Sequence, residues 1–156
     1  QILKNKITLN HNLKKFFIKE YYKPNLQYKF TSHLSKIANT SIDISDGLID
    51  DLSKLINKQN LSFQLYEKKI PISNNLNKLI KIKKLKKMNL ISKGDDYQIL
   101  FTASANKSRI IKNISRITNV KISNIGKIIS GKTKSFIINQ KGKQILAKYK
   151  GYLHQF

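Results

Sequence analysis

The stretch at residues 40–55, TSIDISDGLIDDLSKL, constrains the fold more than any other part of the chain. In an extended chain Ile42 and Ile44 point to one side, and Asp43 and Ser45 point to the other. This alternation predicts a strand with one apolar and one polar face, ending near Ser45.

A helix is predicted directly after this strand. Gly47 breaks the alternation, and apolar residues then recur at helical spacing up to about residue 57. The apolar face consists of Leu48, Ile49, Leu52, Leu55 and Ile56. The stretch therefore predicts a strand, a tight turn and a helix, with polar side chains gathered at the turn.

The acidic residues are concentrated at this turn and at one other place. The chain has eight acidic residues against thirty-one basic ones. Six of the eight form two short clusters, namely Asp43, Asp46, Asp50 and Asp51 in the first and Asp95 and Asp96 in the second. Neighbouring carboxylates repel unless a cation or a helix N-terminus offsets them, so the clusters indicate a metal-phosphate site.

Helix capping offers a second interpretation of the first cluster. Asp46 is placed to cap the helix, and Asp50 and Asp51 fall in or near its first turn, where acidic residues are favoured. Capping does not account for Asp43, because Asp is depleted inside strands. Both interpretations stay open on the residues alone.

Composition fits one globular domain. The 156 residues are 40% hydrophobic with seven Tyr and seven Phe, and they include no cysteine. This excludes disulfides and thiolate metal sites. No apolar run reaches the roughly 18 residues of a membrane span, and no signal peptide is recognisable, so we expect a cytoplasmic protein without a membrane partner.

The net charge of +23 raises the question of nucleic acid. Arg109 and Arg116 are the only arginines, although fork-shaped recognition of phosphate favours Arg over Lys. Abundant Lys, Ile and Asn are typical of proteins encoded by AT-rich genomes. We therefore expect a solvated basic surface that binds nucleic acid only non-specifically. A small RNA- or ribosome-binding protein that uses its lysine-rich helix at residues 74–88 is the alternative.

The rest of the chain alternates between helical and strand patterns. Pro24 is expected to end the first helix, and Thr31 or Ser32 to cap the second. Helices are predicted at residues 7–22, 33–38, 74–88 and 106–117. Strands are predicted at residues 61–66, 97–102, 120–129, 134–139 and 144–149, the last two joined by a turn at residues 140–143. The fold class is α/β, a mixed β-sheet with helices packed on one face.

Six segments follow one another along the chain: YYKPNLQY, SIDISDGLIDDLSKL, IPIS, SKGDDYQILFT, SNIGKI and KGYLHQF. Together they resemble the C-terminal half of thiamine-monophosphate kinase, a member of the aminoimidazole-ribonucleotide-synthetase-like superfamily. Hydrogenase maturation and selenophosphate enzymes are similar in fold but lack the two acidic motifs of this set.

The resemblance implies transfer of the γ-phosphate of ATP to thiamine monophosphate. It implies that Asp43 and Asp46 coordinate Mg²⁺, that Ser45 contacts the nucleotide, and that Asp95 and Tyr152 contact the substrate. No residue is assigned as a general base. Phosphoryl transfer depends mainly on positioning and charge neutralisation, and Mg²⁺ prefers a few carboxylates plus phosphate oxygens and water.

The chain departs from the family pattern in its second acidic motif, where Lys93 replaces a glycine, Asp95 a glutamate, and Gln98 a second glutamate. At the end of the chain, Leu153 and an inserted Gln155 also depart from it. A flexible Lys93 could instead attract phosphate.

A larger departure concerns the part of the family that these residues do not match. Residues 1–156 are expected to form a single C-terminal domain. The family's N-terminal domain, which supplies most metal-binding aspartates, the nucleotide pocket and the homodimer contact, is expected to be absent from this chain. We therefore expect the chain to be inactive alone; a non-functional gene remnant is a further alternative.

Overall fold

The computed structural model describes residues 8–56, 59–94, 96–131 and 133–147. Its helices are α1 (His11–Tyr22), α2 (Tyr28–Ile37), α3 (Leu48–Leu55), α4 (Asn74–Lys83), α5 (Lys87–Ile91) and α6 (Ser108–Thr118), with 3₁₀ turns η1 (Glu67–Lys69) and η2 (Ala105–Lys107). Its strands are β1 (Thr40–Asp43), β2 (Leu61–Tyr66), β3 (Ile99–Thr102), β4 (Gly126–Ser130), β5 (Phe136–Ile138) and β6 (Gln144–Leu146). The predicted α/β fold class is confirmed.

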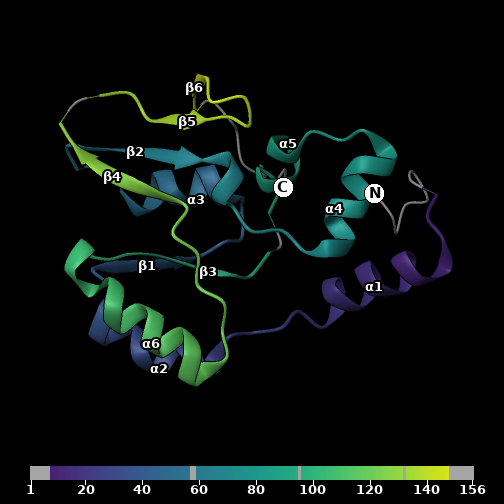
Figure 1. Cartoon of the computed structure of the whole chain (residues 1–156), viewed down its shortest axis with the longest axis horizontal. Coiled ribbons are helices and arrows are strands. Elements are labelled where there is room, and N and C mark those ends of the chain that lie inside the picture. Colours follow the sequence, from purple (N-terminus) through teal and green to yellow (C-terminus); the bar gives the residue numbers. More distant parts are fainter. Residues whose placement is uncertain (1–7, 57–58, 95, 132, 148–156) are drawn as a thin grey trace, which may run out of the picture.

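The strands of the described residues divide into two sheets rather than one (Figure 1). β1 and β3 form an antiparallel pair in which Thr40 lies opposite Thr102 and Asp43 opposite Ile99. The larger sheet has the order β4-β2-β5-β6. It is mixed, because β2 runs parallel to β5 but antiparallel to β4.

The small sheet carries helices on both faces, as the alternation along β3 shows. Leu100 belongs to the main core, whereas its neighbours Ile99 and Phe101 pack against a second cluster between α2 and α6. The main core joins the apolar face of α3 to β2, β5 and α5, through residues such as Ile49, Phe63 and Ile137 (Figure 1). α3 is thereby held between the two sheets, with its first residue beside the end of β1.

The first two helices differ from prediction mainly in their starts. α1 ends at Tyr22, as Pro24 predicts, and Asn10 caps its start by accepting the Leu13 N–H. The expected caps of the second helix are wrong, because α2 starts at Tyr28 with no side-chain cap. Thr31 and Ser32 lie inside it, where their hydroxyls donate to carbonyls one turn back.

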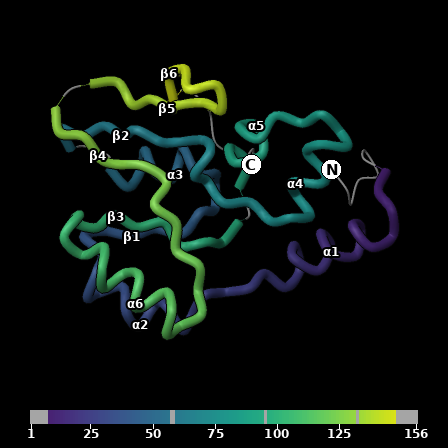
Figure 2. Tube along the Cα trace, viewed as in Figure 1, coloured from purple at the N-terminus to yellow at the C-terminus, as the bar shows by residue number. Residues whose placement is uncertain are grey.

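The single helix predicted at residues 74–88 is two separate helices, α4 and α5, joined by a short connection (Figure 2). Lys84 adopts the left-handed conformation at φ 50°, which ends α4. Lys87 then anchors α5, since its ammonium donates to the carbonyls of Glu67 and Ile70 at 2.8 and 2.5 Å. Burial lowers the pKa of Lys87, and the Glu67 carboxylate opposes that shift.

The strand predicted at residues 120–129 is too long. Only its residues 126–129 belong to a strand, β4, which pairs with β2 and extends to Ser130. Val120 and Ile122 pack instead against the cluster between α2 and α6. The hairpin at residues 140–143 is present, and the part of β6 that lies within the described residues ends at Leu146. Within these residues no helix is both long and apolar enough to cross a membrane.

Candidate functional site

The loop between β1 and α3 is held by a carboxylate that lies after it in the sequence. Asp51, in the first turn of α3, accepts three backbone N–H groups through one oxygen, Oδ2. The donors are Ser45, Asp46 and Gly47, at 2.9, 3.0 and 3.1 Å. The Asp51 side chain is 1% exposed. A buried carboxylate is tolerated because charge-assisted hydrogen bonds compensate for its desolvation.

This arrangement corrects the predicted capping. Gly47, at φ +124°, occupies the N-cap position of α3, and no side chain caps it. Asp46 therefore does not cap the helix. The prediction that Asp50 and Asp51 lie in the first turn is confirmed. Asp51 performs the stabilising role from inside the helix, which leaves the Asp46 side chain directed elsewhere.

Three carboxylates of the loop and helix converge on one cation. The Lys54 ammonium pairs with Asp46, and it lies 3.1 Å from Oδ2 of Asp50 and 3.1 Å from Oδ1 of Asp51. The hydrogen bond that Lys54 donates to Asp46 raises the pKa of Lys54 above its ordinary range. Those it donates to Asp50 and Asp51 add to the shift, while desolvation opposes it. One positive charge thus faces three negative ones.

The same three aspartates could hold a metal ion. One carboxylate oxygen from each of Asp46, Asp50 and Asp51 lies within 4.8 Å of the other two. Hard carboxylate oxygens are the donors that Mg²⁺ prefers, so the donor set fits that ion. Asp51 is the most constrained of the three, because its Oδ2 already holds the loop.

Asp43 is not a member of this group. It is the last residue of β1, exposed, and opposite Ile99 in the register. Ser45 is half-buried, with its N–H bound by Asp51. The structure therefore brings Asp46 together with Asp50 and Asp51, and the metal role of Asp43 and the nucleotide role of Ser45 stay predictions.

The second acidic motif meets the first through backbone contacts. A Cβ placed on Gly47 would lie 2.6 Å from the Ser92 carbonyl oxygen, and one on Gly94 would overlap the Ser45 carbonyl. Beyond β1, Ile44 and Tyr97 continue the pairing with an N–H from Tyr97 to the Ile44 carbonyl at 2.9 Å. Two segments about fifty residues apart thus form one surface.

The substrate residues of the prediction are not tested. Asp95 and Tyr152 lie outside the described residues. Lys93, the proposed phosphate-attracting residue, is exposed at the junction of the two motifs.

Sequence reasoning missed the roles of Asp51 and Lys54. Their spacing carried a signal, since Lys54 stands four residues after Asp50 and three after Asp51, which places the three on one helix face. The hydrogen bonds from the backbone of residues 45–47 to Asp51 had no such signal in the sequence. They depend on the backbone conformation at Gly47, which residue spacing does not show.

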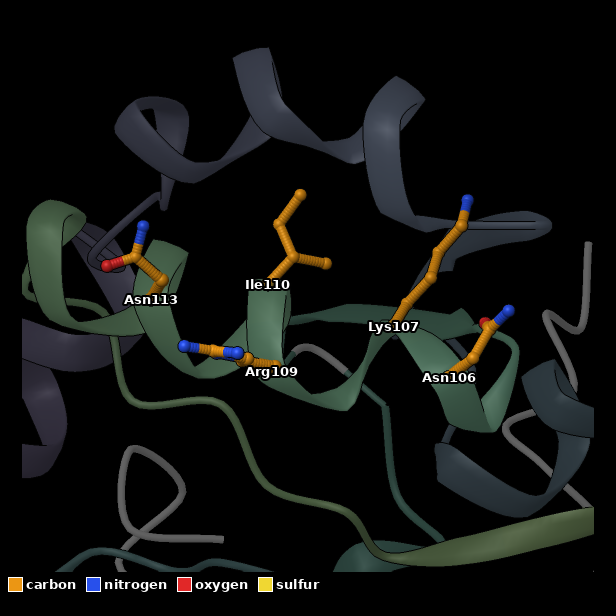
Figure 3. Close-up of a pocket in the computed structure, with 5 residues that line it drawn as sticks. All are labelled: Asn106, Lys107, Arg109, Ile110 and Asn113. Carbon is orange, nitrogen blue, oxygen red and sulfur yellow. The ribbon is translucent and has the colours of Figure 1, made fainter.

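A shallow depression lies elsewhere, at the start of α6 (Figure 3). Its lining residues are Asn106, Lys107, Arg109, Ile110 and Asn113. Because β1 and β3 are antiparallel, the chain leaves β3 for this region at the Thr40 end of the ladder, opposite the end that carries Asp43. The depression is thus separate from the loop between β1 and α3.

Comparison with solved structures defines the class of fold. The chain matches "AaThiL complexed with AMPPCP and TMP" with a TM-score of 0.75 and 24% identity, over 99% of this chain and 45% of that one. It matches the hydrogenase maturation protein HypE of Escherichia coli with a TM-score of 0.63 and 9% identity, over 77% and 38%. The fold is therefore the α/β fold that these two kinds of protein share. No protein-family model matches the chain.

Sequence comparison is more specific. The chain is 32% identical over 155 residues to a thiamine-monophosphate kinase of Buchnera aphidicola from Acyrthosiphon pisum, covering 97% of this chain and 46% of the relative. It is 34% identical over 86 residues to the Aquifex aeolicus kinase, covering 54% and 28%. The predicted resemblance is confirmed: this chain is a relative of the thiamine-monophosphate kinases. It spans about half the length, or less, of the curated relatives it matches.

Proposed function

We propose that this chain serves as the C-terminal half of a kinase that transfers the γ-phosphate of ATP to thiamine monophosphate, giving thiamine diphosphate and ADP. One observation carries the proposal most directly: both acidic motifs of the resemblance, far apart in sequence, pack backbone to backbone. The similarity over 97% of the chain to a thiamine-monophosphate kinase supports the same reading.

The proposed site residues form two groups, one for the metal ion and nucleotide and one for thiamine monophosphate. Asp43 and Asp46 would hold Mg²⁺, and Ser45 would contact the nucleotide. Asp95 and Tyr152 would contact thiamine monophosphate, the tyrosine by stacking on a thiamine ring. When bound, Mg²⁺ neutralises charge on the transferring phosphate. The contribution of Asp51 is to fix the backbone of residues 45–47, so that neighbouring side chains keep one geometry.

The acceptor is a phosphate oxygen of thiamine monophosphate, which is already ionised at neutral pH. A general base is therefore not needed to activate it, in agreement with the absence of an assigned base. What such a site must supply is alignment of donor and acceptor and compensation of their charge.

The proposal includes a second half of the active site, contributed by an N-terminal domain through which the enzyme dimerises. The chain alone is then inactive. The test uses two preparations: the chain itself, and a fusion in which it follows the part of the Buchnera kinase that lies before the matched segment.

With Mg²⁺, ATP and thiamine monophosphate, we expect thiamine diphosphate from the fusion and none from the chain. Asp46→Asn in the fusion should lower the rate at least about a hundredfold, as loss of charge stabilisation at a transferring phosphate does. Thiamine diphosphate formed by the chain alone would contradict the proposal that an N-terminal domain contributes half of the active site. A folded fusion without product, beside an active Buchnera kinase, would contradict the function.

A further inference from the structure

The Lys54 ammonium lies among the oxygens that could hold a metal ion. It touches Asp46, Asp50 and Asp51, the three residues whose carboxylates converge within 4.8 Å. An ammonium group and a divalent ion are both small, compact cations that require the same lone pairs. The two cannot share these oxygens at full occupancy.

We infer that Lys54 is a built-in counter-cation of this group, and that a divalent ion engages Asp46 only by displacing it. The inference rests on the proposed function, because that function is what requires a divalent ion there. It assigns Lys54 a positioning role: it holds the Asp46 side chain near α3 while no metal is bound.

The mobility of the partners favours displacement. The Lys54 side chain is 44% exposed and has a flexible four-carbon stem, so it can withdraw into solvent. Asp46 and Asp50 are 24% and 36% exposed at their side chains. Asp51 is fixed by its three N–H donors and stays in place. The exchange therefore alters the pairing of Asp46 without opening the loop.

Displacing Lys54 reduces the net free energy of metal binding, because the attraction between the ammonium and the carboxylates is lost. A unit positive charge about 4 Å away is worth about 1 kcal/mol even in water. Removing the ammonium should therefore tighten divalent binding about fivefold, the factor to which that energy corresponds. Lys54 thus lowers metal affinity below what the carboxylates alone would give.

The test measures binding of Mn²⁺, which takes the same oxygen donors as Mg²⁺, to the 156-residue chain by electron paramagnetic resonance, without ATP or substrate. Lys54→Met and Lys54→Gln should each bind Mn²⁺ about fivefold more tightly than the unaltered chain. Lys112→Met on α6 is the matched control, since it removes the same charge from an exposed site. Circular dichroism establishes that each variant is folded.

Asp46→Asn added to Lys54→Met should abolish the gain. The inference is overturned if Lys54→Met changes Mn²⁺ affinity no more than Lys112→Met, if it weakens binding, or if neither Lys54 variant binds Mn²⁺. The outcome is separable from the function. Tighter Mn²⁺ binding together with an inactive fusion would contradict the kinase proposal and support this inference. An active fusion without the gain in Mn²⁺ affinity would support the kinase proposal and contradict this inference.

Discussion

At the residue scale, Asp51 does the work that the sequence pattern assigns to Asp46. Asp side chains at the end of a strand commonly cap the following helix. Here the chain passes through Gly47 at φ +124°, which turns three successive N–H groups toward α3. A carboxylate inside the helix receives them, and Asp46 is left to pair with Lys54.

Asp51→Asn should destabilise the chain by about 2–3 kcal/mol. An amide oxygen can still accept hydrogen bonds, but bonds to a charged acceptor are the stronger kind and the Lys54 pairing is lost. Urea unfolding measures the change. Asp50→Asn is the control on the same helix. Its ion pair with Lys54 is partly exposed, so we expect a loss of about 0.5 kcal/mol or less. Equal midpoints for the two variants would refute the loop-holding role.

Gly94 marks the contact between the two acidic motifs. A Cβ there would overlap the carbonyl oxygen of Ser45, which is backbone and cannot rotate away. The sequence retains this glycine although the preceding position is Lys93. Position 94 requires glycine because its backbone lies close to the Ser45 carbonyl, not because of an unusual φ angle, whereas position 93 accepts a lysine.

Gly94→Ala should therefore lower the thermal midpoint, with a cost of about 1–3 kcal/mol from overpacking. Lys93→Ala serves as the control, because the Lys93 side chain is exposed, and it should stay near the unaltered value. A Gly94→Ala midpoint equal to that of Lys93→Ala would mean that the loops do not touch as described.

At the element scale, the break between α4 and α5 is the clearest departure from the sequence pattern. Residues 81–88 contain neither Gly nor Pro, so no local stop signal is present. Lys84 nevertheless takes φ 50°, and the Lys87 ammonium ties the start of α5 to η1. Met88 and Ile91 can then enter the main core, which a continuous straight helix would not place there.

Lys84→Gly should stabilise the chain by about 0.5–1 kcal/mol, since glycine has no Cβ penalty in the left-handed region. Lys83→Gly, one residue earlier and still within α4, should instead cost about 1 kcal/mol. Chemical denaturation of the pair measures both signs. Destabilisation of similar size by the two substitutions would indicate a continuous helix.

At the scale of the whole molecule, the net charge of +23 is spread over lysines on a surface built around two cores. The segment at residues 43–51 is a local exception, because it holds four of the eight acidic residues. Such a surface attracts polyanions through counterion release, and this binding does not distinguish one nucleic-acid sequence from another.

Binding of single-stranded RNA should therefore be weak and independent of sequence. We expect affinity to fall at least about tenfold between roughly 50 and 200 mM salt, as measured by fluorescence anisotropy. Asp43→Asn and Asp46→Asn should not weaken it, because removing negative charge cannot reduce attraction to phosphate. Salt-resistant binding to one RNA sequence would restore the RNA-binding alternative.

The sequence determined the elements whose periodicity is strong and whose ends carry a local signal. The strand at residues 40–43, the helix after Gly47 and the end of α1 before Pro24 all follow from side-chain alternation or backbone sterics. The two acidic motifs could also be recognised, because motif order survives even where single residues change.

Only the tertiary structure decided which patterns found partners. Residues 126–129 pair with β2, while Val120 and Ile122 pack against the cluster between α2 and α6, although the sequence pattern predicts one strand over residues 120–129. The same holds at the site, where Asp51 holds the loop and Lys54 gathers three carboxylates. Hydrogen-bond partners and close backbone contacts between distant segments are properties of packing, and local periodicity carries no record of them.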